Sequence, residues 1–280
     1  SRVSVEPVSY TTVSYVDLDD EPAEAPLPAW IVRESGSGGN AANWVVMVHG
    51  KGSTRAEGLR IVPTLTEMGF TVMLIAYRSG GESPFGTDAR YEYGLTEFAD
   101  LEAAIGMARG RGAASVTLFG YSMGGAVVSS TLQRNNDGLA VAGVPVCAVV
   151  LDSPMLDLRD TVDFGIERTP GMNSRLARAW LNDRIRDVAG WRFDLQWDET
   201  RYVEFLTRMD RPVLFIHSVD DELTRFETTK AVVVARKLGG LETVFLRYDG
   251  LDAAAHTGGW NVDPARYEGA VASFLESCAA

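Results

Sequence analysis

The chain has 280 residues, of which 46% are hydrophobic and 23% are charged, so it can bury a sizeable core and is not disordered along its length. Its 26 basic and 38 acidic side chains give a net charge of −12. An acidic surface without a basic stripe repels phosphate backbones, which argues against a nucleic-acid partner. The same acidity disfavours contact with anionic lipid.

The first part of the chain predicts edge strands and turns. Residues 3–16 are rich in β-branched side chains, which is typical of strands. Three prolines in the stretch 21–28 exclude a helix or a central strand there. Residues 29–33 predict one more strand, and the glycine- and serine-rich stretch 35–40 predicts a turn.

From residue 44 onward, short apolar runs alternate with longer periodic segments. The short runs predict strands buried on both faces, at 44–48, 71–77, 115–119, 146–151, 212–216 and 243–248. The periodic segments predict helices at 95–108, 126–132, 226–238 and 265–275. Strand–helix alternation of this kind is typical of an α/β fold with a doubly wound, mostly parallel sheet.

One long segment interrupts the alternation. About sixty residues separate the strands ending at Leu151 and starting at Pro212, without a clear central strand. They hold three of the six tryptophans, Trp180, Trp191 and Trp197. We interpret residues 155–209 as an inserted helical cap, with some of these indoles facing a pocket, and 1–154 with 210–280 as the core. Ordinary helices packed on the sheet edge are the alternative.

The strongest chemical signal is the sequence Gly120-Tyr121-Ser122-Met123-Gly124, which fits G-x-S-x-G. A predicted strand precedes it and a helix-forming run follows. This context predicts a nucleophile elbow, a sharp strand-to-helix turn that exposes the serine hydroxyl. We therefore identify Ser122 as a candidate nucleophile.

A serine hydroxyl needs a base, and the chain offers three histidines. On a fold with this elbow the chain order is serine, acid, histidine, and only His256 leaves room for an acid in a loop before it. His256 is therefore the candidate base. For His217 we favour a structural role in shaping the loop that carries the acid, and Asp220 and Asp221 in that loop are both candidate acids. Asp152, at the end of the strand before the cap, is a third.

The tetrahedral intermediate of acyl transfer needs two preorganised backbone N–H donors. One is expected from Met123, directly after the nucleophile. The second is expected from the loop His49-Gly50-Lys51-Gly52, where the amide of Lys51 is the candidate donor. Only the backbone acts here, so His49 is interpreted as structural.

These motifs together resemble the α/β-hydrolase superfamily, specifically bacterial members near the serine aminopeptidase and monoacylglycerol-lipase-like branch. The similarity extends over residues 44–275. It rests on His49-Gly50-Lys51-Gly52, Tyr77-Arg78 with Gly80-Gly81-Glu82-Ser83, Gly120 to Gly125, Ile216-His217-Ser218-Val219-Asp220-Asp221, and His256 followed by Pro264, Tyr267 and Phe274-Leu275. The resemblance implies an α/β-hydrolase fold.

In such relatives the acid falls four positions after a histidine like His217, which selects Asp221 over Asp220. This chain departs from the relatives at Ser218, where glycine is usual, and at Thr224-Arg225, where valine and proline are common.

The sequence thus predicts a serine hydrolase that cleaves carboxylic esters through an acyl-serine, with the triad Ser122, His256 and Asp221 and the amides of Lys51 and Met123 as oxyanion donors. No metal or organic cofactor is needed. The expected partner is a small ester or acyl compound. A peptidase or amidase on the same triad, and a catalytically silent ligand-binding fold, are the alternatives. The sequence leaves the oligomeric state open.

The remaining expectations concern cysteines and localisation. Cys147 lies in an apolar run and is interpreted as a buried core thiol, without a bridge to Cys278. The longest near-apolar run, 140–151, is too short to span a membrane. Because the chain starts at Ser1, we expect that an upstream segment was removed, which leaves localisation open between the cytoplasm and export or anchoring.

Overall fold

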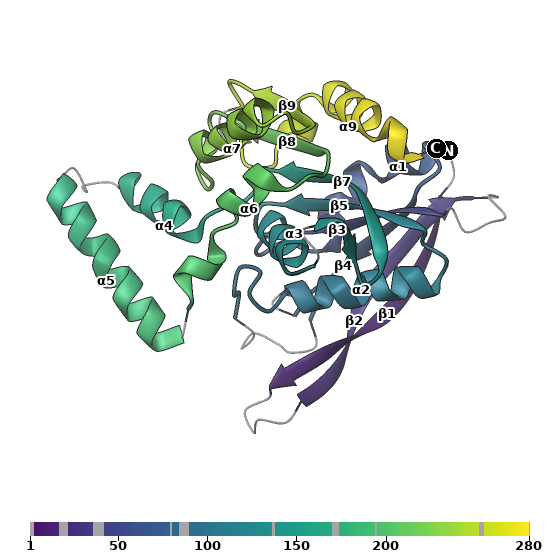
Figure 1. Cartoon of the computed structure of the whole chain (residues 1–280), viewed down its shortest axis with the longest axis horizontal. Helices are drawn as coiled ribbons and strands as arrows, with labels where there is room; N and C mark the ends of the chain where they lie inside the picture. Colours follow the sequence, from purple (N-terminus) through teal and green to yellow (C-terminus); the bar gives the residue numbers. More distant parts are fainter. Residues whose placement is uncertain are drawn as a thin grey trace.

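A computed structural model describes residues 3–16, 22–35, 42–78, 80–83, 90–135, 138–169, 174–193, 195–251 and 255–279. Its centre is one mixed, mostly parallel sheet in the order β1-β2-β4-β3-β5-β7-β8-β9 (Figure 1). The parallel strands are β4 (Thr71–Ile75), β3 (Asn43–Val48), β5 (Ser115–Tyr121), β7 (Val144–Asp152), β8 (Val213–Ser218) and β9 (Thr243–Tyr248). The six predicted central strands are therefore confirmed, and the non-consecutive neighbours mean that helices cross over between them.

Helices cover both faces of this sheet, which makes it doubly wound. One apolar cluster joins the sheet to α2 (Phe98–Gly110), α3 (Met123–Arg134) and α7 (Phe226–Leu238). A second cluster joins the opposite face to α1 (Val62–Glu67) and α9 (Pro264–Ala279). Because both faces are covered, the central strands β3, β4 and β8 are buried almost throughout, which explains their uninterrupted apolar runs.

Two long antiparallel strands form the edge of the sheet, β1 (Val3–Val16) and β2 (Pro22–Glu34). β2 pairs with β4 only from Ala29 to Val32, so its proline-rich first half has only β1 as a partner and is not central. This agrees with the expectation for residues 21–28. Most of the predicted turn at 35–40 lies outside the described residues.

The segment after β7 is helical, as the fold prediction required. It contains α4 (Leu158–Glu167), α5 (Arg175–Phe193), a short 3-10 helix at Trp197–Thr200 and α6 (Val203–Arg208). In Figure 1, α4 and α5 extend to one side, away from the sheet. The boundaries 155–209 for a separate cap stay a prediction. None of the described helices is both long and apolar enough to cross a bilayer.

The two cysteines are joined, contrary to the expectation of an unbridged core thiol. A disulfide links Cys147 in β7 to Cys278 in α9, with their Cα atoms 6.0 Å apart. The prediction was wrong because the partners are 131 residues apart in sequence. Only the packing of the last helix on the sheet brings them together, and spacing alone does not reveal this.

Candidate active site

Ser122 occupies a strained turn between β5 and α3. Its backbone angles are φ 49° and ψ −116°, a conformation that residues other than glycine rarely adopt. The turn is held because the Ser122 N–H donates to the carbonyl of Asp152 on the neighbouring strand, while the Ser122 carbonyl accepts from Gly125 and Met155. This geometry agrees with the elbow expected from G-x-S-x-G.

The flanking glycines are required by close backbone approach. A Cβ on Gly124 would lie 2.2 Å from the Val48 carbonyl oxygen, and one on Gly120 would lie 2.6 Å from the Gly124 carbonyl oxygen. Both distances are far below any permitted contact. Helix α3 can therefore start directly against β3 and β5 only if both positions lack a side chain.

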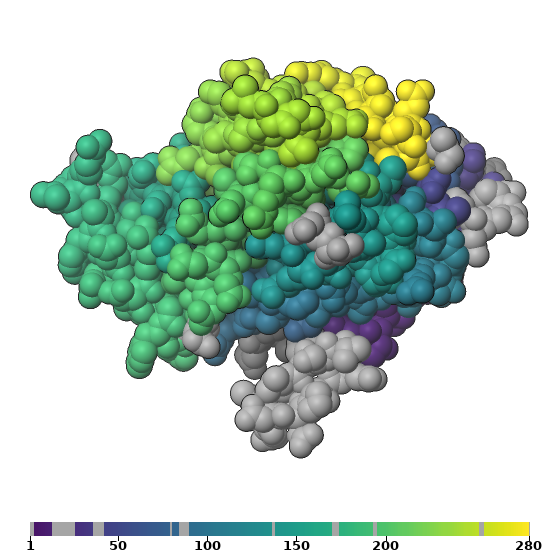
Figure 2. Space-filling model, in the orientation of Figure 1, coloured from purple at the N-terminus to yellow at the C-terminus, as the bar shows by residue number. Residues whose placement is uncertain are grey.

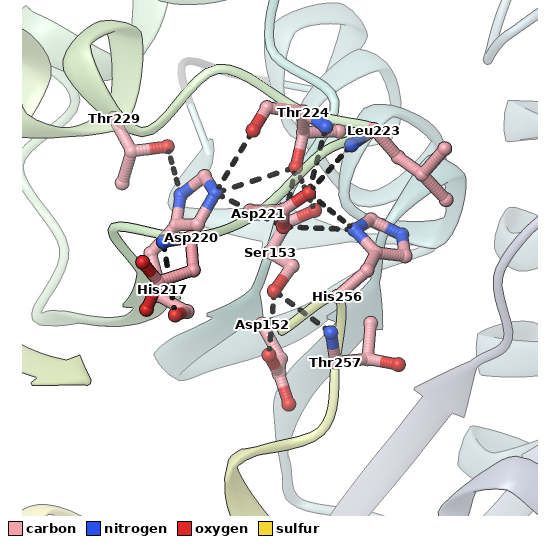
Figure 3. Close-up of polar contacts among 11 residues, drawn as sticks. Asp152, Ser153, His217, Asp220, Asp221, Leu223, Thr224, Thr229, His256 and Thr257 are labelled. Carbon is pink, nitrogen blue, oxygen red and sulfur yellow. Dashed lines mark hydrogen bonds and ion pairs between the residues drawn. The ribbon is translucent and has the colours of Figure 1, made fainter. Parts of the chain in front are cut away.

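The structure brings His256 to Asp221, as predicted. His256 lies in the loop after β9, and Asp221 follows β8 in the adjacent loop (Figure 3). The Nδ1 of His256 is 2.8 Å from one Asp221 carboxylate oxygen and 3.0 Å from the other. Within the described residues, His256 and Ser122 form no hydrogen bond. In many enzymes this contact tightens only when substrate binds.

The Asp221 carboxylate is buried and densely hydrogen-bonded. Besides His256, it accepts from the backbone N–H groups of Leu223 and Thr224 at 2.8 and 2.9 Å and from the Thr224 hydroxyl at 3.0 Å. Burial alone would raise the pKa of Asp221, but the hydrogen bonds and charges of His217 and His256 outweigh it and hold this pKa well below its ordinary value. The carboxylate is therefore ionised throughout the neutral range.

His217 contacts the same carboxylate from the other side. Its Nε2 lies 3.2 Å from Asp221 Oδ2, and its Nδ1 lies 2.9 Å from the Thr229 hydroxyl. If Nε2 carries the proton, it donates to Asp221 while Nδ1 accepts from Thr229. Figure 3 shows Asp221 between the two imidazoles. The expected role of His217 in shaping the acid loop agrees with these contacts.

The two alternative acids are engaged elsewhere. Asp220 accepts from the backbone N–H groups of Gly250 and Leu251 at 2.6 and 3.1 Å, and so fastens the two loops together. Asp152 accepts from the Tyr267 hydroxyl at 2.7 Å, and burial raises its pKa. Neither carboxylate bonds to His256 among the described contacts.

The loop after β3 is fixed so that one peptide group faces a defined direction. The carbonyl of Gly50 lies 2.8 Å from His49 Nδ1 and 3.4 Å from the Tyr77 hydroxyl. In a trans peptide the C=O and the following N–H point in opposite directions, so this carbonyl directs the Lys51 N–H away from His49 and Tyr77. A Cβ on Gly50 would lie 3.1 Å from the Ser122 Cβ, so the loop passes directly beside the serine.

The two candidate oxyanion donors differ in how they are kept available. Met123 is the first residue of α3, and its N–H has no acceptor within the helix. The loop around the Lys51 N–H is held by other hydrogen bonds. The Gly50 N–H donates to the Glu57 carboxylate at 2.7 Å, and the Ser53 N–H donates to the Gly50 carbonyl. Burial lowers the pKa of His49, which keeps its imidazole neutral in the loop.

A cavity of about 480 Å³ opens beside Lys51, between the core and the helices after β7. Its wall is mostly apolar and includes Leu158, Val162, Ile185, Ala189, Leu195 and Trp197, with Lys51, Arg90, Tyr91, Glu92 and Tyr93 at the polar end. Of the three tryptophans expected near a pocket, Trp197 lines this cavity. The other two, Trp180 and Trp191, are mainly exposed to solvent.

Ion pairs connect α4 to the loop of Asp221. Arg225 bonds to Asp160 at 2.8 Å and to Glu167 at 3.0 Å, and Arg168 pairs with Glu222. Arg225 is one of the departures from the resembling family, and so is Thr224, which bonds to Asp221. Arg225 therefore binds this loop to α4, whereas Thr224 holds the Asp221 carboxylate within the loop.

Several supporting residues were not predicted from the sequence. Glu57 holds the Gly50 amide, Ser153 accepts from the N–H of Thr257 beside His256 at 3.0 Å, and Thr229 fixes the His217 ring. Ser153 and Thr257 are 104 residues apart in the chain, whereas Glu57 and Thr229 lie 7 and 12 residues from their partners. None forms a local motif, so no sequence signal marks them.

Comparison with known proteins agrees with this geometry. The family model described as serine aminopeptidase, S33, a hydrolase family, matches residues 39–250. The chain belongs to this family. It is thus a member of the α/β-hydrolase superfamily, as the sequence motifs implied.

This S33 family member is similar to one curated human protein and, in fold, to solved structures named as an esterase and as a peptidase. Human protein ABHD12B is 28% identical over 193 residues, which cover 66% of this chain and 48% of that protein, so the chain spans about half the length of this relative. The Pyrococcus furiosus esterase Pf2001 has a TM-score of 0.67 at 19% identity, covering 99% of this chain and 93% of the esterase. The Pyrococcus horikoshii acylaminoacyl peptidase has a TM-score of 0.65 at 15% identity, covering 97% of this chain and 41% of that protein. At such identities the structural likeness concerns the fold.

Proposed function

We propose that this hydrolase cleaves carboxylic esters through an acyl-serine intermediate. Ser122 is the nucleophile, His256 its base and Asp221 the acid that orients His256. The observation that carries the proposal is the bond between His256 Nδ1 and Asp221, in a chain whose only G-x-S-x-G serine occupies a strained elbow. Asp221 fixes the tautomer that leaves Nε2 free to take the serine proton.

In the first half of the reaction, the Ser122 hydroxyl attacks the ester carbonyl while His256 accepts its proton. The backbone N–H groups of Lys51 and Met123 stabilise the resulting oxyanion, and the protonated imidazole then returns its proton to the leaving alkoxide. Water repeats the attack on the acyl-serine with His256 as base.

The cavity favours an ester with an apolar acyl or alcohol group over an aminopeptidase substrate. Its wall is mainly aliphatic and aromatic, which suits a hydrocarbon chain. An aminopeptidase must also bind a protonated α-amine. The charged residues that line the described part of the cavity are Lys51, Arg90 and Glu92. The Lys51 ammonium lies over the ring of Tyr91 and bonds to the Tyr93 hydroxyl at 3.2 Å. A lysine ammonium at this position opposes the binding of a second ammonium group.

The test is a panel of p-nitrophenyl esters of increasing chain length, assayed beside aminoacyl p-nitroanilides. We expect ester hydrolysis to dominate and Ser122→Ala to reduce kcat by at least about 10⁴-fold while the protein stays folded. The exposed Ser273 provides the matched control, and Ser273→Ala should keep full activity. Faster cleavage of the anilides would make the enzyme a peptidase on the same triad. No turnover of either class would favour a silent binding fold.

A further inference from the structure

Ser153 directly follows β7, at a point where three loops of the site come together. The residue is buried, with 1% of its surface exposed, and its backbone has φ 47°, a left-handed conformation that residues other than glycine rarely adopt. Its N–H donates to the carbonyl of Ile216 on the neighbouring strand β8 at 2.8 Å. A strained backbone of this kind persists only where surrounding contacts hold it, and such positions cluster at active sites.

The main chain at Asp152 and Ser153 contacts the loops of the nucleophile and of the acid. The Asp152 carbonyl accepts from the Ser122 N–H at 2.9 Å. The Ser153 carbonyl oxygen lies 3.1 Å from the Thr224 hydroxyl, which is also 3.0 Å from the Asp221 carboxylate. Two adjacent peptide groups therefore fix the serine and the acid relative to each other.

The Ser153 side chain reaches the third loop, which carries the base. Its Oγ accepts from the N–H of Thr257, the residue after His256, at 3.0 Å (Figure 3). Thr257 has φ 53°, so this hydrogen bond joins two left-handed residues. The Ser153 hydroxyl donates to Asp152 Oδ1 at 3.2 Å, and the other Asp152 oxygen accepts from Tyr267 on α9 at 2.7 Å. Because its proton goes to a fixed carboxylate, the Ser153 oxygen keeps a lone pair directed at Thr257.

From these contacts we propose that Ser153 is a positioning residue for His256, an inference that rests on the proposed acyl-serine route. Asp221 holds the imidazole at Nδ1, but a ring held at one atom can still pivot about that contact. The hydroxyl of Ser153 fixes the backbone directly after His256 and so sets where the opposite nitrogen, Nε2, lies. A base displaced by about 1 Å from its nucleophile loses much of its effect, so this anchor acts on the rate without contacting the reacting atoms.

Two substitutions separate the hydroxyl from the backbone strain, with hydrolysis of p-nitrophenyl butyrate as the assay. Ser153→Ala removes only Oγ, whereas Ser153→Gly also relaxes the left-handed backbone and folds where alanine does not. We expect kcat to fall about thirtyfold in both variants with KM within about twofold of the wild type. If strain alone mattered, Ser153→Ala would keep the wild-type kcat and Ser153→Gly would only gain stability, which would overturn the proposal.

The matched control is Thr66→Val, which removes another buried hydroxyl. Thr66 lies in α1 and bonds to the carbonyls of Val62 and Pro63, both at 3.0 Å. This variant should lose stability but keep the wild-type kcat, because its hydroxyl holds no loop of the site.

A second measurement does not depend on turnover. The proton on His256 Nδ1, in its hydrogen bond to Asp221, should give a far-downfield NMR signal, assigned by its absence in His256→Ala. We expect this signal to shift or broaden in both Ser153 variants and to stay unchanged in Thr66→Val. An unchanged signal in both Ser153 variants would overturn the proposal. A changed signal in a protein that hydrolyses no ester would support the positioning of His256 and overturn only the proposed function.

Discussion

The loop that carries Asp221 and helix α5 differ in how their side chains are used. The loop buries a hydrogen-bonded carboxylate, whereas α5 exposes large apolar side chains. Around Asp221 every contact is specified: the carboxylate is 2% exposed and bonds to His256, His217 and the following turn. On α5 the side chains of Leu176, Trp180 and Trp191 are exposed, and ion pairs join Asp187 to Arg184 and Asp183 to Arg186 along the helix. Figure 2 shows the segment after β7 at one edge of the molecule. Buried charge tolerates few arrangements, whereas an exposed helix face is free to meet a partner. The first region holds one carboxylate in a fixed position, and the second leaves its side chains accessible to solvent.

The largest expected effect on kcat comes from changing the two carboxylates of the acid loop, Asp221 and Asp220, one at a time. Asp221→Asn should reduce kcat by about 10⁴-fold, because an amide stabilises the wrong imidazole tautomer. Asp220→Asn is the neighbouring control and should keep near-normal kcat, since an asparagine oxygen can still accept from Gly250 and Leu251. Steady-state ester hydrolysis by both variants measures the difference. A larger loss in Asp220→Asn would reverse the assignment of the acid.

Removing the disulfide should change the stability of the fold without changing the active site. Cys147 lies towards the amino end of β7, whereas Asp152 and the site lie at the carboxyl end. Replacing both cysteines by alanine should lower the free energy of unfolding by about 2–4 kcal/mol, chiefly by relaxing the unfolded chain, and leave kcat unchanged. Urea denaturation with and without reductant measures this. Only the wild type should respond to the reductant, and a variant of wild-type stability would contradict the prediction.

Replacing His217, which contacts Asp221, should have a smaller effect on kcat than replacing Asp221 itself. His217→Leu removes one donor to a buried carboxylate and should lower the free energy of unfolding by about 1.5–3 kcal/mol, with a kcat loss well below that of Asp221→Asn. His217→Gln can still donate and should recover part of both. Equal losses in the leucine and glutamine variants would show that the hydrogen bond to Asp221 is not the cause.

The pH dependence of the same variants distinguishes positioning from packing. The folded-state pKa of Asp221 is lowered, so its stabilising contribution is present above the unfolded-state pKa of about 3.9 and is lost as pH falls below it. Removing the His217 donor should raise the folded-state pKa of Asp221. The stability gap between wild type and His217→Leu should therefore be widest near neutral pH and narrow below about pH 4. A gap that is constant from pH 7 to pH 3 would indicate lost packing alone.

The sequence predicted the central strands and the strand-to-helix turn at Ser122 because their signals are local. The choice of Asp221 over Asp220 came instead from the family resemblance. An uninterrupted apolar run predicts a buried strand, and two glycines around Ser122 are required by its immediate backbone. The sequence failed where distant segments meet. The bridge from Cys147 to Cys278 depends on how α9 packs, and the outward orientation of Trp180 and Trp191 depends on which side of α5 the core covers. Length and aromatic content predict that some of the three indoles face the pocket, but they do not say that Trp197 is the one that does.

The central claim is that Ser122 is a nucleophile activated by His256, and that Asp221 orients His256. The most direct measurement is labelling of the intact protein with a fluorophosphonate, followed by mass spectrometry of the modified peptide. The account predicts one covalent adduct on Ser122, formed rapidly in wild type, strongly slowed in His256→Ala and Asp221→Asn, and absent in Ser122→Ala. An adduct on another serine, or labelling of Ser122 at the same rate in all three proteins that retain it, would contradict the account.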